Sequence, residues 1–369
     1  MRRTVIGMAI GALASLAQAE SSVTLYGVAD ANIEYANNLS RVTPTAANGF
    51  ATGAAGDRFA VASGGLSGSR WGLRGTEDLG AGLKALLVLE SGFSIDTGSS
   101  QQSGRLFGRQ AYVGLQYGNS QFTFGRQYTS AFDAFANFAP ARYATQYDPA
   151  VALLGLNYRS DNTAKYIGTF GGLIAQAHWS FGNGVAGAGE VPGQFRRDTG
   201  YGGALTYGSG TLGLTLTYDQ YNPTLTSAGA TGLFRKIGGA ASYTLGPAKL
   251  IAGYRWGRNT GANGNALLRD NFYWVGTNYQ ATSALGLWLA YYYLDVKNLA
   301  GVDIKNPWQI TAIANYALSK RTDIYVTSAY SRNSGLNFDT SAISFANGYF
   351  LASGKNSMLG AAIGIRHRF

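Results

Sequence analysis

The stretch KLIAGYRWGR, residues 249–258, changes the character of its side chains at nearly every step. Four even positions are apolar or aromatic: Leu250, Ala252, Tyr254 and Trp256. Lys249 and Arg255 occupy odd positions between them. Successive side chains of a β-strand point to opposite faces of the sheet. The stretch therefore predicts a strand with one apolar and one polar face.

The same two-residue period recurs in LTLTYDQY (214–221) and in VTLYGVADANIEY (23–35). A soluble β-sandwich would also give this alternation, because it buries one face of each sheet and wets the other. Two features favour a membrane barrel instead. The alternating segments run about ten residues, whereas soluble strands usually have about five or six. Aromatic residues also gather near segment ends, as in LWLAYYYLD (287–295), where a girdle at the membrane interface would lie.

The composition favours the same class of protein. Charged residues make up 13% of the chain, against about 25% in ordinary soluble domains. Glycine (52) and tyrosine (24) are plentiful, and cysteine is absent. Residues 1–19 combine a basic start, a short apolar run and the small-residue sequence AQA, so they are predicted to form a cleaved signal peptide. Export leaves one domain, residues 20–369, with no apolar run near the ~20 residues of a spanning helix.

Short and long connections alternate between the predicted strands. The short ones lie at residues 77–82, 117–121, 208–210 and 245–247, and the long ones at 38–57, 183–198, 222–233, 258–268 and 334–355. Short periplasmic turns on one rim and longer external loops on the other are typical of outer-membrane barrels. The hairpins indicate about sixteen strands, enough to leave an aqueous lumen. The predicted fold is an all-β, sixteen-stranded antiparallel transmembrane β-barrel.

Five motifs resemble the general porins of β-proteobacteria: SSVTLYG (21–27), SRWGLRGTEDLGAGLKALLVLESGF (69–93), FGRQAYVGL (107–115), FTFGRQY (122–128) and the closing IRHRF (365–369). The resemblance spans the mature chain. It implies a homotrimeric outer-membrane pore, in contact with outer-membrane lipid and lipopolysaccharide, whose third loop folds into the lumen. It also implies that the outer-membrane assembly machinery recognises the terminal Phe369. Independently, the alternation predicts that Phe369, Ile365 and Ile363 face lipid.

The connection at residues 129–154 is the candidate for the inward-folded loop and the narrowest part of the pore. A connection this long is usually functional. Its aromatic residues would be wasted on an exposed loop and are predicted to pack on the barrel wall. An external loop like the others is the alternative. The charged residues of the loop are Asp133, Arg142 and Asp148.

A basic wall is predicted opposite this loop. In the second strand Arg58, Arg70 and Arg74 share one parity, whereas Trp71 and Leu73 hold the other. A strand that turns its tryptophan to lipid must turn these arginines to the lumen.

Further strands add candidates for the lumen face: Lys84 and Glu90 in the third strand, Arg159 and Lys165 after the long loop, Arg109 where the alternation is blurred, and Arg126. Similar porins carry an arginine cluster at the constriction, and the positions that match it here are Arg70, Arg109 and Arg159. Crowded arginines in a narrow aqueous passage attract anions, because their charge does not titrate near neutral pH.

The predicted function is passive diffusion of small hydrophilic solutes and ions, with a preference for anions. A channel selective for small anions such as organic acids or phosphate is the first alternative, and it would need several stacked basic rings. A non-conducting adhesin or structural barrel is the second, and it would need bulky lumen residues. The inward faces are instead predicted to be rich in small residues, which leave room for solutes.

An enzymatic function is not predicted. The chain has two histidines, His178 and His367, and neither has a serine in a recognisable catalytic setting. His178, beside Trp179, is interpreted as a membrane-interface residue. The sequence contains no metal-spaced ligand cluster, so no metal and no cofactor are predicted. Nucleic acid is not a predicted partner, because the chain is exported and lacks a basic patch interleaved with stacking aromatics.

Overall fold

The computed structural model describes residues 22–149, 158–182, 190–301, 303–339 and 348–369. The predicted signal peptide at 1–19 lies outside the described residues, as do the last five residues of the predicted inward loop, 150–154. None of the described helices is long and apolar enough to cross a membrane.

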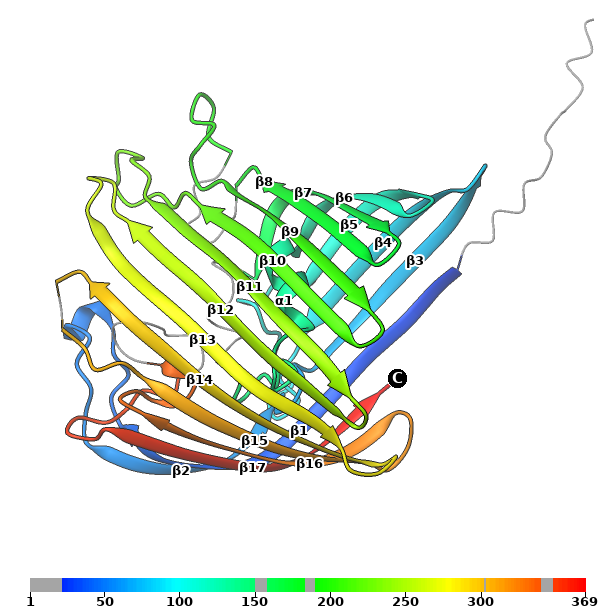
Figure 1. The fold of residues 1–369 in the computed structure, drawn as a ribbon. Helices are drawn as coiled ribbons and strands as arrows, with labels where there is room; N and C mark the ends of the chain where they lie inside the picture. The colour runs from blue at the N-terminus through cyan, green and yellow to red at the C-terminus, as the bar shows by residue number, and fades with distance from the viewer. Residues whose placement is uncertain (1–21, 150–157, 183–189, 302, 340–347) are drawn as a thin grey trace, which may run out of the picture.

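One antiparallel sheet closes on itself to form a barrel (Figure 1). Its strands are β1 (Ser22–Ser40), β2 (Ala55–Ser63), β3 (Arg70–Gly80), β4 (Leu83–Gly92), β5 (Gln110–Tyr117), β6 (Ser120–Tyr128), β7 (Arg159–Phe170), β8 (Leu173–Ser180), β9 (Gly200–Ser209), β10 (Leu212–Tyr221), β11 (Leu233–Leu245), β12 (Ala248–Thr260), β13 (Ala266–Gln280), β14 (Leu285–Leu299), β15 (Trp308–Ala317), β16 (Thr322–Arg332) and β17 (Ser357–Arg368). The other elements are η1 (Ala46–Asn48), α1 (Ser130–Ala136) and η2 (Leu336–Phe338).

The seventeen described strands make a sixteen-stranded barrel because β2 and β3 form one interrupted strand. β1 pairs with β2 along its second half and with β3 along its first half. The interruption at residues 64–69 is held by Asp30 of β1, whose carboxylate accepts the backbone N–H groups of Gly65, Leu66 and Ser67. On its other edge β1 pairs with β17, which closes the sheet. The prediction of sixteen antiparallel strands is confirmed.

The predicted separation of faces is also present. On β2 the odd positions Phe59 and Val61 are 78% and 61% exposed on the outer surface, where a membrane would cover them. On β12 the even position Leu250 is 51% exposed, whereas the odd position Arg255 is fully buried on the lumen side. Alternation in the middle of these strands therefore places apolar side chains toward lipid and charged side chains inside.

The lumen face differs from the expected one of mostly small residues. Trp274 of β13 and Tyr292 of β14 point inward and are almost completely buried. They lie beneath the inward loop, so they serve as its packing surface. In the stretch LWLAYYYLD this means that Tyr291 and Tyr293 face outward, while Trp288 and Tyr292 face the lumen.

The rims largely match the predicted alternation of connections. Tight turns join β3 to β4, β5 to β6, β9 to β10 and β11 to β12, and the C-terminus lies at their rim (Figure 1). The predicted long loop at 258–268 is shorter than expected, because β12 and β13 extend into it and leave only 261–265. The sequence reading also missed the long connection at 93–109 between β4 and β5.

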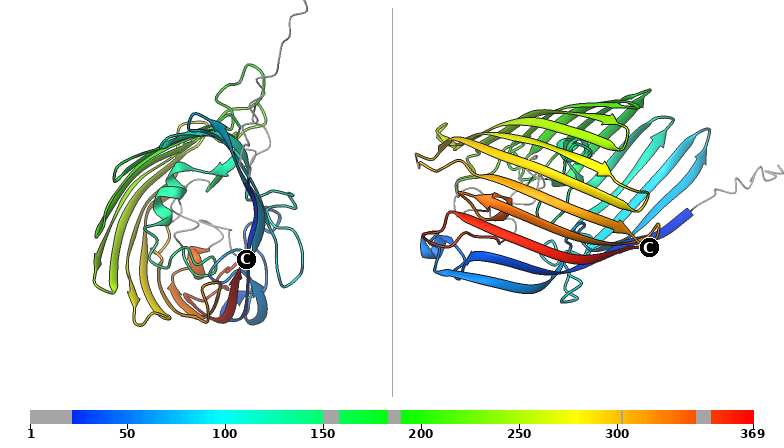
Figure 2. Two further views of the ribbon diagram at one scale, coloured as in Figure 1. Left: turned by 90° about the vertical axis from the view of Figure 1, so that its right-hand side faces the viewer. Right: turned by 60° about the horizontal axis from the view of Figure 1, so that its bottom comes forward.

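The connection after β6 folds into the barrel, as predicted (Figure 2). Phe135 of α1 packs edge-on against Trp274, with ring centroids 5.5 Å apart. The indole N–H of Trp274 donates to the carbonyl of Phe138 at 2.8 Å, and Asn278 donates to the carbonyl of Pro140 at 2.6 Å. These contacts satisfy loop backbone groups that would otherwise be buried without partners. The buried apolar side chains at this loop–wall interface form one continuous cluster.

Candidate pore constriction

The inward loop is fixed at its start by polar contacts. The side chain of Thr129 accepts the N–H of Phe132 and so caps α1. Lys165 of β7 forms an ion pair with Asp133 at the middle of α1. This pair neutralises one of the two acidic residues predicted for the loop.

The side chain of His178, on β8 of the barrel wall, contacts the start of α1. Its Nδ1 lies 3.2 Å from the backbone nitrogen of Ser130 and 3.0 Å from the hydroxyl of Ser130. The residue is buried on the lumen side of the wall. The interpretation of His178 as a membrane-interface residue is therefore wrong: Trp179 faces outward, and the alternation of the strand turns its neighbour inward.

The far end of the described loop is fixed to β1. The hydroxyl of Tyr147 donates to Glu34 at 2.7 Å, and Gln146 donates to Asn32 at 3.2 Å. Burial, together with the nearby Tyr349 and Glu34, raises the pKa of Tyr147, so its hydroxyl stays a proton donor. The loop thus spans the lumen from β6 to β1 (Figure 2).

The described parts of a second segment, residues 334–339 and 348–350, lie beside it on the lumen side, whereas the sequence predicts an external loop at 334–355. Tyr349 also donates to Glu34, and Asn337 donates to the carbonyl of Gln146 at 2.6 Å. Leu336, Phe338 and Tyr349 are buried. The signal that could have found it was the aromatic content of the segment, the same signal that identified the first inward loop.

Four arginines line one cavity of about 520 Å³ between the loop and the wall: Arg70, Arg109, Arg142 and Arg159. Tyr128 lies among them, and its hydroxyl accepts from Arg109 at 2.8 Å and from Arg159 at 3.0 Å. The three positions that the resemblance matched to a constriction cluster are therefore brought together. Arg142, assigned only to the loop, joins them.

One acidic residue contacts this cluster. Glu90 lies 2.7 Å from Nε of Arg109 and 3.5 Å from Nε of Arg70, and it is nearly buried. Among the described residues, neither Arg142 nor Arg159 has an acidic partner within ion-pair distance. Four guanidinium groups with one carboxylate leave the cavity strongly positive.

The described part of the loop contributes one positive charge, from Arg142, and two acids that both have partners. Asp133 is paired with Lys165, and the buried Asp148 accepts the backbone N–H of Tyr143 at 3.2 Å. Arg142 instead lies with its guanidinium over the ring of Trp288, 5.0 Å from the centroid. Burial lowers the pKa of Arg142, and the like charges of Arg366 and Arg368 lower it further. An arginine remains charged at neutral pH even so.

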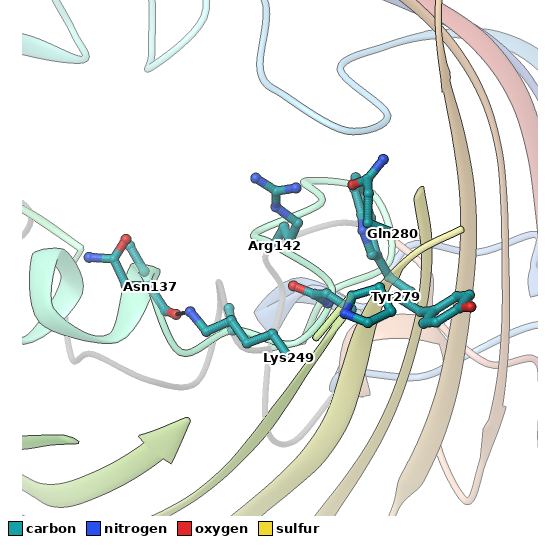
Figure 3. A pocket seen from close by; sticks show the side chains of 10 residues that line it. Asn137, Arg142, Lys249, Tyr279 and Gln280 are labelled. Atoms are coloured by element: carbon teal, nitrogen blue, oxygen red, sulfur yellow. Dashed lines mark hydrogen bonds between the residues drawn. The ribbon is translucent and has the colours of Figure 1, made fainter. Parts of the chain in front are cut away.

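Arg142 also borders two further cavities. One, of about 450 Å³, includes Lys249, whose ammonium group donates to the carbonyl of Asn137 (Figure 3). The other, of about 370 Å³, includes Lys320, Arg366 and Arg368. Arg366 and Arg368 are both paired with Asp323. The positive lining therefore continues from the arginine cavity toward the tight-turn rim.

The remaining predicted basic residues lie elsewhere. Arg58 pairs with Glu34 at 2.8 Å and lines a separate cavity with Tyr349. Arg126 pairs with Asp161 and donates to the carbonyl of Gly108.

Arg74 lies over the ring of Tyr26, 5.2 Å from its centroid. Lys84 follows the tight turn between β3 and β4, opposite Asp78. The register of β6 and β7 shifts between Gly125 and Gln127, so the predicted common parity of Arg159 and Lys165 is interrupted. Arg159 nevertheless lines the arginine cavity, from the end of its strand.

Comparison with known proteins places this geometry in context. A family model described as Gram-negative porin matches residues 6–336. The chain is 32% identical to an outer membrane porin protein of Bordetella pertussis and 30% identical to outer membrane porin protein 32 of Delftia acidovorans, each over the full length of both chains.

Two solved structures show the same architecture. The anion-selective porin from Comamonas acidovorans is 28% identical and superposes with a TM-score of 0.75, covering 95% of this chain and all of the other. OmpT of Vibrio cholerae is 15% identical, with a TM-score of 0.66 over 95% of this chain and 98% of the other, a likeness of fold alone.

Proposed function

The chain belongs to the Gram-negative porin family and is a non-enzymatic channel of the bacterial outer membrane, and on this premise we propose that its inward loop and arginine cavity make the channel prefer anions. The solutes would be small, hydrophilic and negatively charged, such as chloride, carboxylates and phosphates. They would pass by diffusion, with no bond made or broken.

The charge balance of the constriction carries the proposal. A pore that sets an acidic loop against a basic wall creates a field across the passage but has little net charge. Here Asp133 is paired with Lys165 and Asp148 is buried, while Arg142 of the loop adds its positive charge to that of the wall arginines. A passing anion meets positive charge from both directions, whereas a cation is repelled by both.

The arrangement also favours the passage of anions rather than their tight binding. Arg109 and Arg159 share the hydroxyl of Tyr128, and Arg109 is held by Glu90. A guanidinium already committed to partners gives a solute fewer hydrogen bonds. Attraction that is spread over several partly satisfied groups lets an anion enter and still leave.

Reversal potentials across a KCl gradient in planar bilayers test the proposal. The double variant Arg142→Gln and Arg159→Gln removes the two cavity arginines that have no described acidic partner. We expect its chloride-to-potassium permeability ratio to fall severalfold, since each unit charge at ~6 Å contributes roughly 0.7 kcal/mol in water. Arg58→Gln, which removes a lumen arginine outside this cavity, is the matched control. An unchanged reversal potential in the double variant would refute the role of the cavity.

A channel selective for one small anion is the second candidate, and a specific observation favours it. Arg142 borders three successive basic cavities, so the pore has more than one place where an anion could pause. Such a channel would show conductance that saturates with one organic acid or with phosphate. Simple diffusion predicts conductance proportional to concentration for all small anions.

Assembly and export complete the proposal. Phe369 exchanges backbone hydrogen bonds with Gly27 at the closing seam of the barrel, and its ring occupies the space where a side chain on Gly27 would lie. This supports a role for the terminal residue as the signal read by the assembly machinery. We also infer cleavage of residues 1–19 and a homotrimer; a trimer form is described for OmpT of Vibrio cholerae.

A further inference from the structure

Arg142 of the inward loop is held differently from the three wall arginines of the cavity. The wall arginines each donate at least one hydrogen bond to the protein: Arg70 to the carbonyl of Gly68, Arg109 to Glu90 and Arg159 to the hydroxyl of Tyr128. In the described part of the chain, the guanidinium group of Arg142 has no hydrogen-bond or ion-pair partner, and it lies over the ring of Trp288 of β14, 5.0 Å from the centroid. The position of this charge therefore depends on an aromatic ring.

The backbone of the loop directs Arg142 to this place at a conformational cost. Arg142 and Tyr143 have φ angles of 56° and 58°, in the left-handed region that residues with side chains rarely adopt. The buried carboxylate of Asp148 accepts the N–H of Tyr143 at 3.2 Å and so stabilises the turn. Figure 3 shows the guanidinium group of Arg142 directed away from Lys249. Strained backbone of this kind is concentrated at functional sites, which indicates that the placement of Arg142 matters to the pore.

The charged neighbours of Arg142 do not hold it in place. Lys249 shares one of its cavities, and Arg366 and Arg368 share another, so these groups repel it. Asp323, which also lines the second cavity, is already paired with both Arg366 and Arg368. The face of an aromatic ring attracts a guanidinium group that lies within about 6 Å of its centroid. Trp288 therefore supplies the attraction that selects one position for a long side chain surrounded by like charges.

Trp288 is well placed to act as a fixed platform. Its side chain faces the lumen from β14, is only 8% exposed, and belongs to the apolar cluster at the loop–wall interface. Together with Arg142 it borders both cavities on the tight-turn side of the arginine cavity. Stacking covers the flat face of a guanidinium group and leaves the N–H groups around its edge available to a solute.

We propose that Trp288 is a positioning residue for ion selection, whose ring holds the guanidinium group of Arg142 at the junction of the three basic cavities. This inference rests on the proposed anion preference of the channel. A charge fixed at the junction acts on each anion that passes from the arginine cavity toward the tight-turn rim. Released from the ring, the same charge would spread over the lumen and act more weakly, because Coulomb attraction falls with distance.

Reversal potentials across a KCl gradient in planar bilayers compare two substitutions at this position. Trp288→Leu removes the aromatic face and is expected to lower the chloride-to-potassium permeability ratio about twofold, whereas Trp288→Phe keeps a face and should give the ratio of the unsubstituted protein. In an Arg142→Gln background, Trp288→Leu should change nothing further, because its effect passes through Arg142. Equal ratios in the Leu and Phe variants would overturn the proposal, as would an equal fall in the Arg142→Gln background.

A second measurement keeps the test decisive if Trp288→Leu fails to fold. Replacing every tryptophan with 5-fluorotryptophan withdraws electron density from the indole faces, which weakens their attraction for a cation while nearly preserving their shape. Among the described residues, Arg142 on Trp288 is the only cation–π pair that uses a tryptophan, so the label reports on this pair. We expect the permeability ratio to fall in the labelled unsubstituted protein and to stay constant in labelled Arg142→Gln protein. A constant ratio in both would refute the positioning role.

The same recordings separate this inference from the proposed function. The permeability ratio of the unlabelled, unsubstituted protein tests the anion preference alone, and a ratio of one or less would refute that preference. The role of Trp288 is decided by the difference between Trp288→Leu and Trp288→Phe and by the effect of the label. A channel that prefers anions but shows neither change would keep the proposed function and lose the positioning residue.

Discussion

Arg255 and Arg159 show that an arginine facing the lumen can either stabilise the barrel wall or act on a passing solute. Arg255 of β12 is fully buried and bound through Nη1 to both carboxylate oxygens of Asp270, each at 2.8 Å. Arg159, a few strands away, has a tyrosine hydroxyl and two tyrosine rings as its described partners. The first arginine is cancelled by its neighbour and belongs to the wall. The second keeps its field and can act on a solute.

The partner on the adjacent strand decides between these roles. Gly257 makes the first case possible, because a side chain there would collide with Asp270 and with Arg255. Opposite Arg159, β6 presents Tyr128, which accepts a hydrogen bond but does not cancel the charge. A positive pore therefore requires arginines facing the lumen and, in addition, an absence of carboxylates at the neighbouring positions.

The largest effect on stability should follow from removing Asp270, the carboxylate that neutralises Arg255. Asp270→Asn leaves Arg255 charged, buried and unpaired, which typically destabilises a protein by about 3–5 kcal/mol. We expect a marked fall in the urea midpoint of unfolding in detergent, with little change in ion selectivity among the molecules that fold. The double variant Asp270→Asn and Arg255→Met should recover most of the loss. If Asp270→Asn alone is as stable as the unsubstituted protein, the pair is not a structural element.

An intermediate effect is expected where the inward loop meets β1. Tyr147→Phe deletes one hydrogen bond to the buried Glu34, and bonds to charged groups contribute roughly 1.5–3 kcal/mol. Because Tyr349 and Arg58 still hold Glu34, the barrel should remain folded while the loop end loosens. Single-channel recordings should show added conductance fluctuations. Tyr291→Phe, which removes a tyrosine hydroxyl on the outward face of β14 and leaves the loop untouched, gives the comparison; quiet channels in Tyr147→Phe would contradict the anchoring role.

The distinction between the two arginine groups marks the limit of the sequence reading. Alternation decides which face a side chain takes, so the barrel, its lipid face and the inward position of Arg70 follow from the sequence. It does not fix which residues on neighbouring strands lie opposite each other. Glu90 was placed in the lumen by parity, but its position between Arg70 and Arg109 depends on the pairing of β3, β4 and β5.

Irregular segments were the other source of error. The register shift between β6 and β7 breaks the parity rule next to the arginine cavity. The interruption between β2 and β3 does not, because Arg58 and Arg70 on either side of it both line lumen cavities. The alternation of β8 turns His178 inward beside the outward Trp179, but its contact with Ser130 depends on the path of the inward loop, which no local pattern encodes. The aromatic content of the segment that holds Tyr349 was a usable signal, but it does not show that this side chain contacts Glu34. Buried loop contacts depend on three-dimensional placement, which periodicity along one strand cannot supply.

The smallest effect should come from removing the acidic partner of Lys165, which leaves the positive charge of Lys165 unneutralised. Asp133→Asn removes the loop carboxylate that pairs with Lys165, while Lys165 keeps its hydrogen bond to the carbonyl of Tyr128. The pore gains one positive charge, and a unit charge that acts over ~10 Å contributes roughly 0.4 kcal/mol in water. We expect the chloride-to-potassium permeability ratio to rise by about twofold at low salt, opposite in sign to the effect of removing Arg159.

Salt and a distant acid control this last measurement. The Debye length falls from about 8 Å at physiological ionic strength to about 3 Å at 1 M, so the increase should vanish in concentrated KCl. Asp78→Asn, at the tight-turn end of β3, changes the net charge equally but should leave the ratio unchanged. A ratio that stays constant in Asp133→Asn at low salt would mean that the charge of Lys165 does not act on the passage. The pair would then belong with Arg255 and Asp270 as part of the wall.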